Sequence, residues 1–137
     1  MTTLPTVVCV IGTRPEAIKM APVVAALRAG NRARCVVIAT AQHRGLLDQM
    51  LARLDIPVDH DLDLMTEGQT PAELIARMLP ALDALLAVTA PDVVLAQGDT
   101  TTVLVAALAA FHRRVHEAHS HARLHRAHGA RPIRIAR

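Results

Sequence analysis

Residues 6–19 decide the fold and read Thr6-Val7-Val8-Cys9-Val10-Ile11-Gly12-Thr13-Arg14-Pro15-Glu16-Ala17-Ile18-Lys19. The uninterrupted apolar run at their start predicts a parallel strand that is covered on both faces. Gly12 ends this run, and Pro15 suits the first turn of a helix that continues until Gly30. Parallel strands present their carboxyl ends and the following helix starts to one edge of the sheet. This turn therefore lies where α/β proteins bind anions, and its backbone N–H groups are expected to be free for phosphate.

Strand and helix signals alternate along the rest of the chain. Strands are predicted over 34–40 and 92–96, and helices over 46–54, 71–88 and 100–111. Thr70 and Glu73 have the spacing of a capping box, with Pro71 at the first helical position. This alternation predicts an α/β fold, a Rossmann-like doubly wound parallel sheet.

The pattern changes at residue 112, where neither the helix period nor the strand period continues. We therefore expect a Rossmann-like domain over 1–111 and an atypical Arg/His-rich tail over 112–137. Most of the excess positive charge of the chain lies in this tail, where Glu117 is the single acid. Histidine pairs such as His112 and His116 have the i, i+4 spacing of metal ligands on a helix, but few acidic and no cysteine ligands accompany them, so no metal is expected.

The composition is that of one globular domain. The 137 residues are 52% hydrophobic and 20% charged, with a formal net charge of +3. One Phe and no Tyr or Trp leave no surface for stacking bases, so a nucleic acid partner is not expected. No apolar run is long enough to span a bilayer, and we expect a cytoplasmic protein with no membrane partner. Cys9 and Cys35 fall in apolar strands, where free buried thiols are expected.

Polar residues follow two of the predicted strands at the same edge of the sheet. Arg14 and Lys19 can balance a diphosphate, and Thr100 begins a helix with hydroxyl and backbone donors. Asp99 is the unusual member, because a carboxylate beside an anion is unfavourable unless it transfers a proton or binds a sugar hydroxyl. Taken singly, Asp99 is also explained as a helix N-cap, and the two cations as a solvated face.

Several common motifs are missing from the sequence. There is no G-x-G-x-x-G after the first strand, no G-x-x-x-x-G-K-[ST] and no G-x-S-x-G. The sequence therefore favours neither a dinucleotide-binding protein, nor a P-loop nucleotidase, nor a hydrolase with a serine nucleophile.

Four segments together resemble one family. They are GTRPEAIKMAPVV (12–24), TAQHRGLLDQML (40–51), DHDLDLM (59–65) followed by GQT (68–70), and PDVVLAQGDTTTVLVAALAAF (91–111). In this order and spacing they resemble the N-terminal domain of non-hydrolysing UDP-N-acetylglucosamine 2-epimerases, over about residues 6–111.

The resemblance implies a fold, a reaction and a set of site residues. The family has two Rossmann-like domains of the glycosyltransferase-B type and interconverts UDP-GlcNAc and UDP-ManNAc, precursors of bacterial surface polysaccharide, without a cofactor. UDP is eliminated to a 2-acetamidoglucal and then added back with the opposite configuration at C2. By the same resemblance Asp99 is catalytic, and Arg14 and Lys19 lie near the diphosphate. Gln42 and His43 match a segment that holds a second, allosteric UDP-GlcNAc, and a homodimer is implied.

The chain departs from the family pattern after residue 111. Where the family has HVEAGLRT, His119 falls on the histidine, His121 falls on the position of a catalytic glutamate, and Glu117 is out of register. The second domain, which holds most of the UDP in the family, has no counterpart. We therefore expect a truncated epimerase that is inactive alone. A hydrolysing relative or another glycosyltransferase-B enzyme is one alternative, and a non-catalytic nucleotide-sugar-binding or dimerisation module is another.

Overall fold

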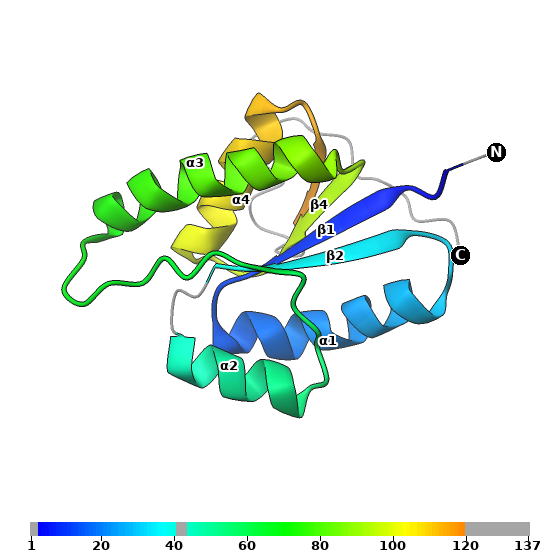
Figure 1. Cartoon of the computed structure of the whole chain (residues 1–137), viewed down its shortest axis with the longest axis horizontal. Helices are drawn as coiled ribbons and strands as arrows, with labels where there is room; N and C mark the ends of the chain where they lie inside the picture. Colours follow the sequence, from blue (N-terminus) through cyan, green and yellow to red (C-terminus); the bar gives the residue numbers. More distant parts are fainter. Residues whose placement is uncertain (1–2, 41–43, 120–137) are drawn as a thin grey trace.

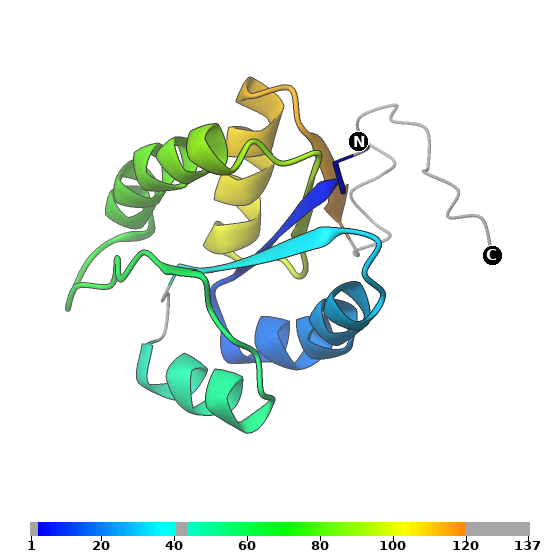
Figure 2. The same ribbon diagram turned by 45° about the vertical axis from the view of Figure 1, so that its right-hand side comes forward.

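The computed structural model describes residues 3–40 and 44–119. Five parallel strands form one sheet in the order β3-β2-β1-β4-β5, and helices cover both of its faces (Figures 1 and 2). The strands are β1 (Thr6–Ile11), β2 (Arg34–Ala39), β3 (His60–Asp61), β4 (Val93–Ala96) and β5 (His116–His119). The helices are α1 (Arg14–Ala29), α2 (Arg44–Arg53), α3 (Pro71–Thr89) and α4 (Thr101–His112). The predicted Rossmann-like doubly wound parallel sheet is confirmed.

The sheet separates the core into two layers, and alternate residues of its central strand β1 belong to each layer. Val8 and Val10 are completely buried in the layer under α3 and α4, whereas Cys9 and Ile11 are completely buried in the layer against α1 and α2. Figure 1 shows the two helix pairs on opposite sides of the sheet. A strand that is covered on both faces needs apolar residues at every position, which explains the unbroken run in the sequence.

Two helix starts use the same local chemistry. At α3, Thr70 N donates to Glu73 Oε2 over 2.7 Å, and Glu73 N donates to the Thr70 hydroxyl over 3.2 Å, which confirms the predicted capping box. The hydrogen bonds that the Thr70 N–H and hydroxyl donate to the Glu73 carboxylate hold its pKa below the usual value. At α1, Glu16 occupies the equivalent position, three residues after Thr13.

Two strands were not predicted. β3 has two residues, and β5 lies beyond residue 111, in the segment for which no regular pattern was found. β5 pairs with β4 from Val93 opposite His116 to Ala96 opposite His119. Both are edge strands of this sheet, so neither requires the continuous apolar run that marks a central strand.

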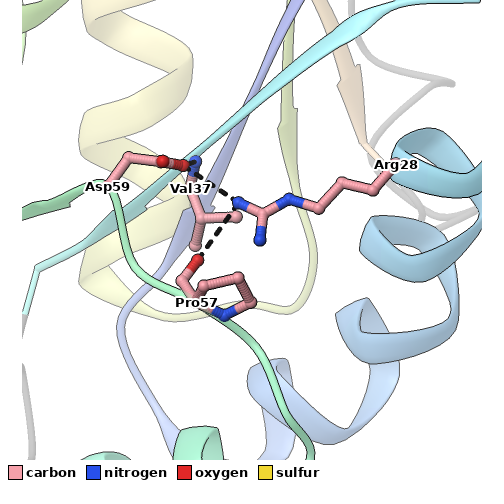
Figure 3. A network of polar contacts seen from close by, with 4 residues as sticks. All are labelled: Arg28, Val37, Pro57 and Asp59. Carbon is pink, nitrogen blue, oxygen red and sulfur yellow. Dashed lines mark hydrogen bonds and ion pairs between the residues drawn. The ribbon is translucent and has the colours of Figure 1, made fainter. Parts of the chain in front are cut away.

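Polar contacts connect the helices to the sheet and to one another. Arg28 of α1 donates to Pro57 O over 3.2 Å and to Asp59 over 3.0 Å, and the same Asp59 oxygen accepts from Val37 N over 2.7 Å (Figure 3). On the opposite face, Arg113 forms a two-point ion pair with Asp83, with distances of 2.6 and 2.7 Å.

Both cysteines are free thiols, as predicted, although Cys35 is only partly buried. Burial raises the pKa of the Cys9 thiol, and the neighbouring Cys35 adds to this effect, so the Cys9 thiol stays protonated at neutral pH.

Across residues 3–40 and 44–119, none of the helices has the length and apolar character that a membrane crossing requires.

Candidate functional site at the carboxyl edge of the sheet

The turns after β1 and β4 lie side by side at the carboxyl edge of the sheet. The two strands are parallel neighbours, with Val7 opposite Val93 and Cys9 opposite Leu95. The turn after β1 contains Gly12 and Thr13, and the turn after β4 contains residues 97–100. The topology thus brings together segments that are more than 80 residues apart in the sequence.

Glu16 connects the two turns. Its side chain is almost completely buried, with 2% of its surface exposed. Oε2 accepts hydrogen bonds from Gly12 N over 2.6 Å and from Thr13 N over 3.1 Å, and Oε1 accepts one from the Thr100 hydroxyl. The expectation that the start of α1 offers free N–H groups is therefore wrong for Gly12 and Thr13, because a carboxylate of the chain itself already uses them.

Two strand ends and the start of α4 meet tightly around Gly12. The hydroxyls of Thr40 and Thr102, both completely buried, are hydrogen-bonded over 2.9 Å. A Cβ atom on Gly12 would lie only 2.0 Å from the Thr102 hydroxyl oxygen. Glycine is required at this position because β1, β2 and α4 approach one another too closely for any side chain.

The charged residues singled out in the sequence belong to the elements that meet at this junction, with Arg14 and Lys19 in the first two turns of α1 and Asp99 in the turn after β4. Arg14, Lys19 and Asp99 are exposed, and within the described residues none of them forms a hydrogen bond or an ion pair. Arg14 also lines a small cavity of about 60 Å³ with α2 residues, which are Leu46, Gln49, Met50 and Arg53. Gln42 and His43, the allosteric candidates, lie outside the described residues.

The structure separates the roles of Asp99 and Thr100. The N-cap residue of α4 is Thr100, so the explanation of Asp99 as a helix cap is wrong. The Thr100 hydroxyl makes no capping hydrogen bond, since it donates to Glu16 instead. Asp99 is left as an exposed carboxylate on a turn whose preceding residue, Gly98, has a φ of 112°, a conformation that favours glycine.

Two residues of this edge were given no role from the sequence. Glu16 has the same spacing from Thr13 as Glu73 has from Thr70, so the capping-box pattern could have identified it. Gln97 is 8% exposed, and its side-chain oxygen has no hydrogen-bond partner within the described residues. No periodic or motif signal marks Gln97. Across residues 3–40 and 44–119, no group of three or more His, Cys, Asp and Glu side chains is placed to hold a metal ion.

Glycine-containing turns after two adjacent central strands of a doubly wound sheet define a Rossmann-like protein with its candidate site at the carboxyl edge. The chain belongs to the UDP-N-acetylglucosamine 2-epimerase family, whose model matches residues 25–130. This confirms the resemblance carried by the four sequence segments.

Similar proteins agree with this assignment. The UDP-N-acetylglucosamine 2-epimerase of Escherichia coli is 49% identical over 118 residues, covering 86% of this chain and 31% of the relative. A probable UDP-N-acetylglucosamine 2-epimerase of Ralstonia nicotianae is 48% identical, covering 86% of this chain and 32% of the relative. The chain thus spans about a third of the length of these relatives.

Solved structures give the same result for the fold. The Neisseria meningitidis UDP-GlcNAc 2-epimerase bound to UDP-GlcNAc is similar with a TM-score of 0.77 and 44% identity, over 83% of this chain and 31% of that one. A Streptomyces glycosyltransferase shares the fold with a TM-score of 0.60 at 18% identity, over 84% of this chain and 38% of that one. At that identity, the second likeness concerns the fold alone.

Proposed function

We propose that this chain is the N-terminal part of a UDP-N-acetylglucosamine 2-epimerase that interconverts UDP-GlcNAc and UDP-ManNAc. Membership of the family supports the reaction, and the N. meningitidis relative has been solved with UDP-GlcNAc bound to it. The observation that carries the proposal for this chain is the junction at the carboxyl edge. There Glu16 joins the turn next to Arg14 to the turn that bears Asp99.

In the proposed reaction, a base removes the proton from C2 of the sugar while the bond from C1 to the diphosphate oxygen breaks. UDP leaves, a C1=C2 double bond forms, and re-addition of UDP with protonation from the other face inverts C2. Asp99 is the proposed group for proton transfer, because it is an exposed carboxylate without a partner among the described residues.

The diphosphate carries negative charge that increases as UDP leaves, so the site needs cations beside it. We assign this role to Arg14 and Lys19, whose side chains are exposed on the first two turns of α1. Thr100 would contact the substrate through its backbone N–H, since its hydroxyl is bonded to Glu16.

The remainder of the proposal concerns the whole protein. Because the chain spans about a third of its relatives, a second domain would complete a glycosyltransferase-B architecture, close the site and exclude water from the reactive glycal. The chain alone would then bind the nucleotide sugar weakly and turn over nothing. The boundary expected at residue 111 is one of composition, because β5 beyond it still belongs to the sheet. A cytoplasmic homodimer that supplies polysaccharide precursors belongs to the same proposal.

A titration of the chain with UDP-GlcNAc, followed by the amide resonances of ¹⁵N-labelled protein, tests the proposed site. We expect resonances from the turns after β1 and β4 to shift, and Arg14→Met to weaken binding about tenfold through loss of a charge-assisted contact. Arg32→Met is the matched control, because Arg32 is also exposed but precedes β2, at the opposite edge of the sheet.

Three results would contradict parts of the proposal. A folded chain whose turns do not respond to UDP-GlcNAc would remove the substrate assignment. Equal weakening by both arginine variants would show non-specific attraction of an anion. Conversion of UDP-GlcNAc to UDP-ManNAc by the chain alone would contradict the need for a second domain.

A further inference from the structure

We propose that Glu16 is a positioning residue, which holds the turn that carries Asp99 in one conformation relative to the turn that carries Arg14. The proposal deepens the function proposed above and rests on it for its meaning. The coupling itself is a property of the chain without ligand.

The contacts of Glu16 surround Asp99 on both sides. On the C-terminal side, the Thr100 hydroxyl donates to Glu16 Oε1. On the N-terminal side, the Glu16 side chain fills the space beside Gly98, because a Cβ added to Gly98 would be 3.6 Å from Glu16 Cγ and 3.7 Å from Oε1. Asp99 is therefore an exposed residue between Thr100, which is bonded to the buried carboxylate, and Gly98, which has that carboxylate beside it.

Helix capping does not account for this arrangement. Glu73 has the same spacing in the other capping box, and its hydrogen bonds go to Thr70, three residues away. Glu73 is exposed, whereas Glu16 is 2% exposed and bonds to a residue 84 positions later. A cap needs only the local bonds, so the burial of Glu16 and its third bond require another explanation.

The burial and the third hydrogen bond of Glu16 are explained if Asp99, as a reacting group, must be held in an accurate position. A misplacement of about 1 Å can reduce a rate by about a hundredfold, and a turn that follows a glycine with positive φ has little intrinsic rigidity. The two N–H groups of the α1 turn fix the carboxylate from one side, and the carboxylate then fixes the Thr100 hydroxyl on the other. Through Glu16, the fixed β1–α1 turn thus restrains the backbone of the turn that bears Asp99.

The test compares Thr100→Val, which removes the hydroxyl with little change of shape, with Thr100→Ser, which keeps it. ¹⁵N relaxation on the ligand-free chain gives backbone order parameters for residues 97–100, and side-chain ³J couplings of Asp99 report its rotamer averaging. We expect an order parameter near 0.85 for Asp99 in the wild type and in Thr100→Ser, falling toward about 0.6 in Thr100→Val, with averaged couplings. Glu16→Gln, whose amide can still bond both turns, should remain closer to the wild type than Thr100→Val.

The proposal is overturned if Asp99 keeps wild-type order and couplings in Thr100→Val. It is also overturned if order falls equally in β1 and β4, because the bond would then be purely structural. If Thr100→Val does not fold, Glu16→Gln is compared with Glu16→Ala in the same measurements, and equal order in both overturns the proposal. If Asp99 shows the expected order but UDP-GlcNAc shifts no resonances of the chain, the proposed function is contradicted, whereas the positioning of Asp99 by Glu16 still stands.

Discussion

Replacing Gly12 with alanine puts one methyl group at the point where three elements meet. The new Cβ would lie 2.0 Å from Thr102 Oγ1, 2.7 Å from Thr102 Cβ and 2.7 Å from Thr40 Oγ1. Real Cβ atoms essentially never approach other heavy atoms below 3.0 Å, so the neighbours must move. A rotation about χ1 of Thr102 relieves the first contact but not the second, because Cβ is fixed to the backbone of α4.

The magnitude has two parts. Overpacking of a tight site costs about 1–3 kcal/mol, and displacement of the Thr40–Thr102 hydrogen bond adds about 0.5–1.5 kcal/mol. We therefore expect Gly12→Ala to lower the free energy of unfolding by about 1.5–4.5 kcal/mol, a large fraction of the ~5–15 kcal/mol typical of a domain. With an m-value of about 2 kcal/mol/M, the urea midpoint should fall by about 1–2 M.

Far-UV circular dichroism is the appropriate probe, because the chain has no Trp and no Tyr to report by fluorescence. Gly45→Ala is the matched control, since a Cβ there would have nothing within 4 Å and Gly45 is the second residue of α2. The control should leave the free energy of unfolding unchanged or raise it by up to about 0.5 kcal/mol, because a residue in the first turn gains less from alanine than one in the helix interior. A Gly12→Ala variant within about 0.5 kcal/mol of the wild type would refute the packing argument.

The two ion pairs give further predictions. Asp59→Ala should lower the free energy of unfolding by about 1–2 kcal/mol, because it leaves the N–H of buried Val37 without this acceptor. Arg28→Met should lower it by less than about 1 kcal/mol, because the Arg28–Asp59 ion pair is partly exposed. Urea unfolding of both variants measures the two costs, and equal costs would contradict this order. The hydrogen bond from Arg113 holds the pKa of Asp83 below its usual 3.8, so the ionised form favours the folded state. The stability difference between wild type and Asp83→Asn should be complete above the unfolded-state pKa and vanish as pH falls through the folded-state pKa. Urea titrations between about pH 2 and pH 6 measure it, and a difference that persists at the acid end would contradict the assignment.

The sequence predicted the elements that have two buried faces or an amphipathic pattern. β1 and β4 lie inside the sheet, where burial on both faces demands apolar residues. Within residues 3–40 and 44–119, each helix carries an apolar stripe or a cap that marks it. β3 and β5 were not predicted because an edge strand is paired on one side only and tolerates polar residues, such as His116 and Glu117 in β5. Edge strands are specified by the strand they join, and that information does not reside in their own pattern.

The site was predictable as a place but not as a set of contacts. That the turn at Gly12 and the turn at Asp99 lie at one edge follows from parallel strands alone. The bond between Glu16 and Thr100 depends on β1 and β4 being neighbours, and no local period contains the strand order. Hence sequence reasoning selected the exposed charged residues of the edge and overlooked the buried one that joins its two halves.

The contacts of Glu16 also change how an anion would be bound at this edge. A helix start attracts a phosphate through free N–H groups and a positive partial charge, but at α1 Glu16 bonds to Gly12 N and Thr13 N and brings a carboxylate to that place. In the proposed site, attraction of the diphosphate would then come mainly from the exposed side chains of Arg14 and Lys19, while the buried carboxylate of Glu16 would hold the backbone. A phosphate-binding helix start usually supplies both charge and rigidity through its backbone. Here the side chains would supply the charge and the backbone the rigidity.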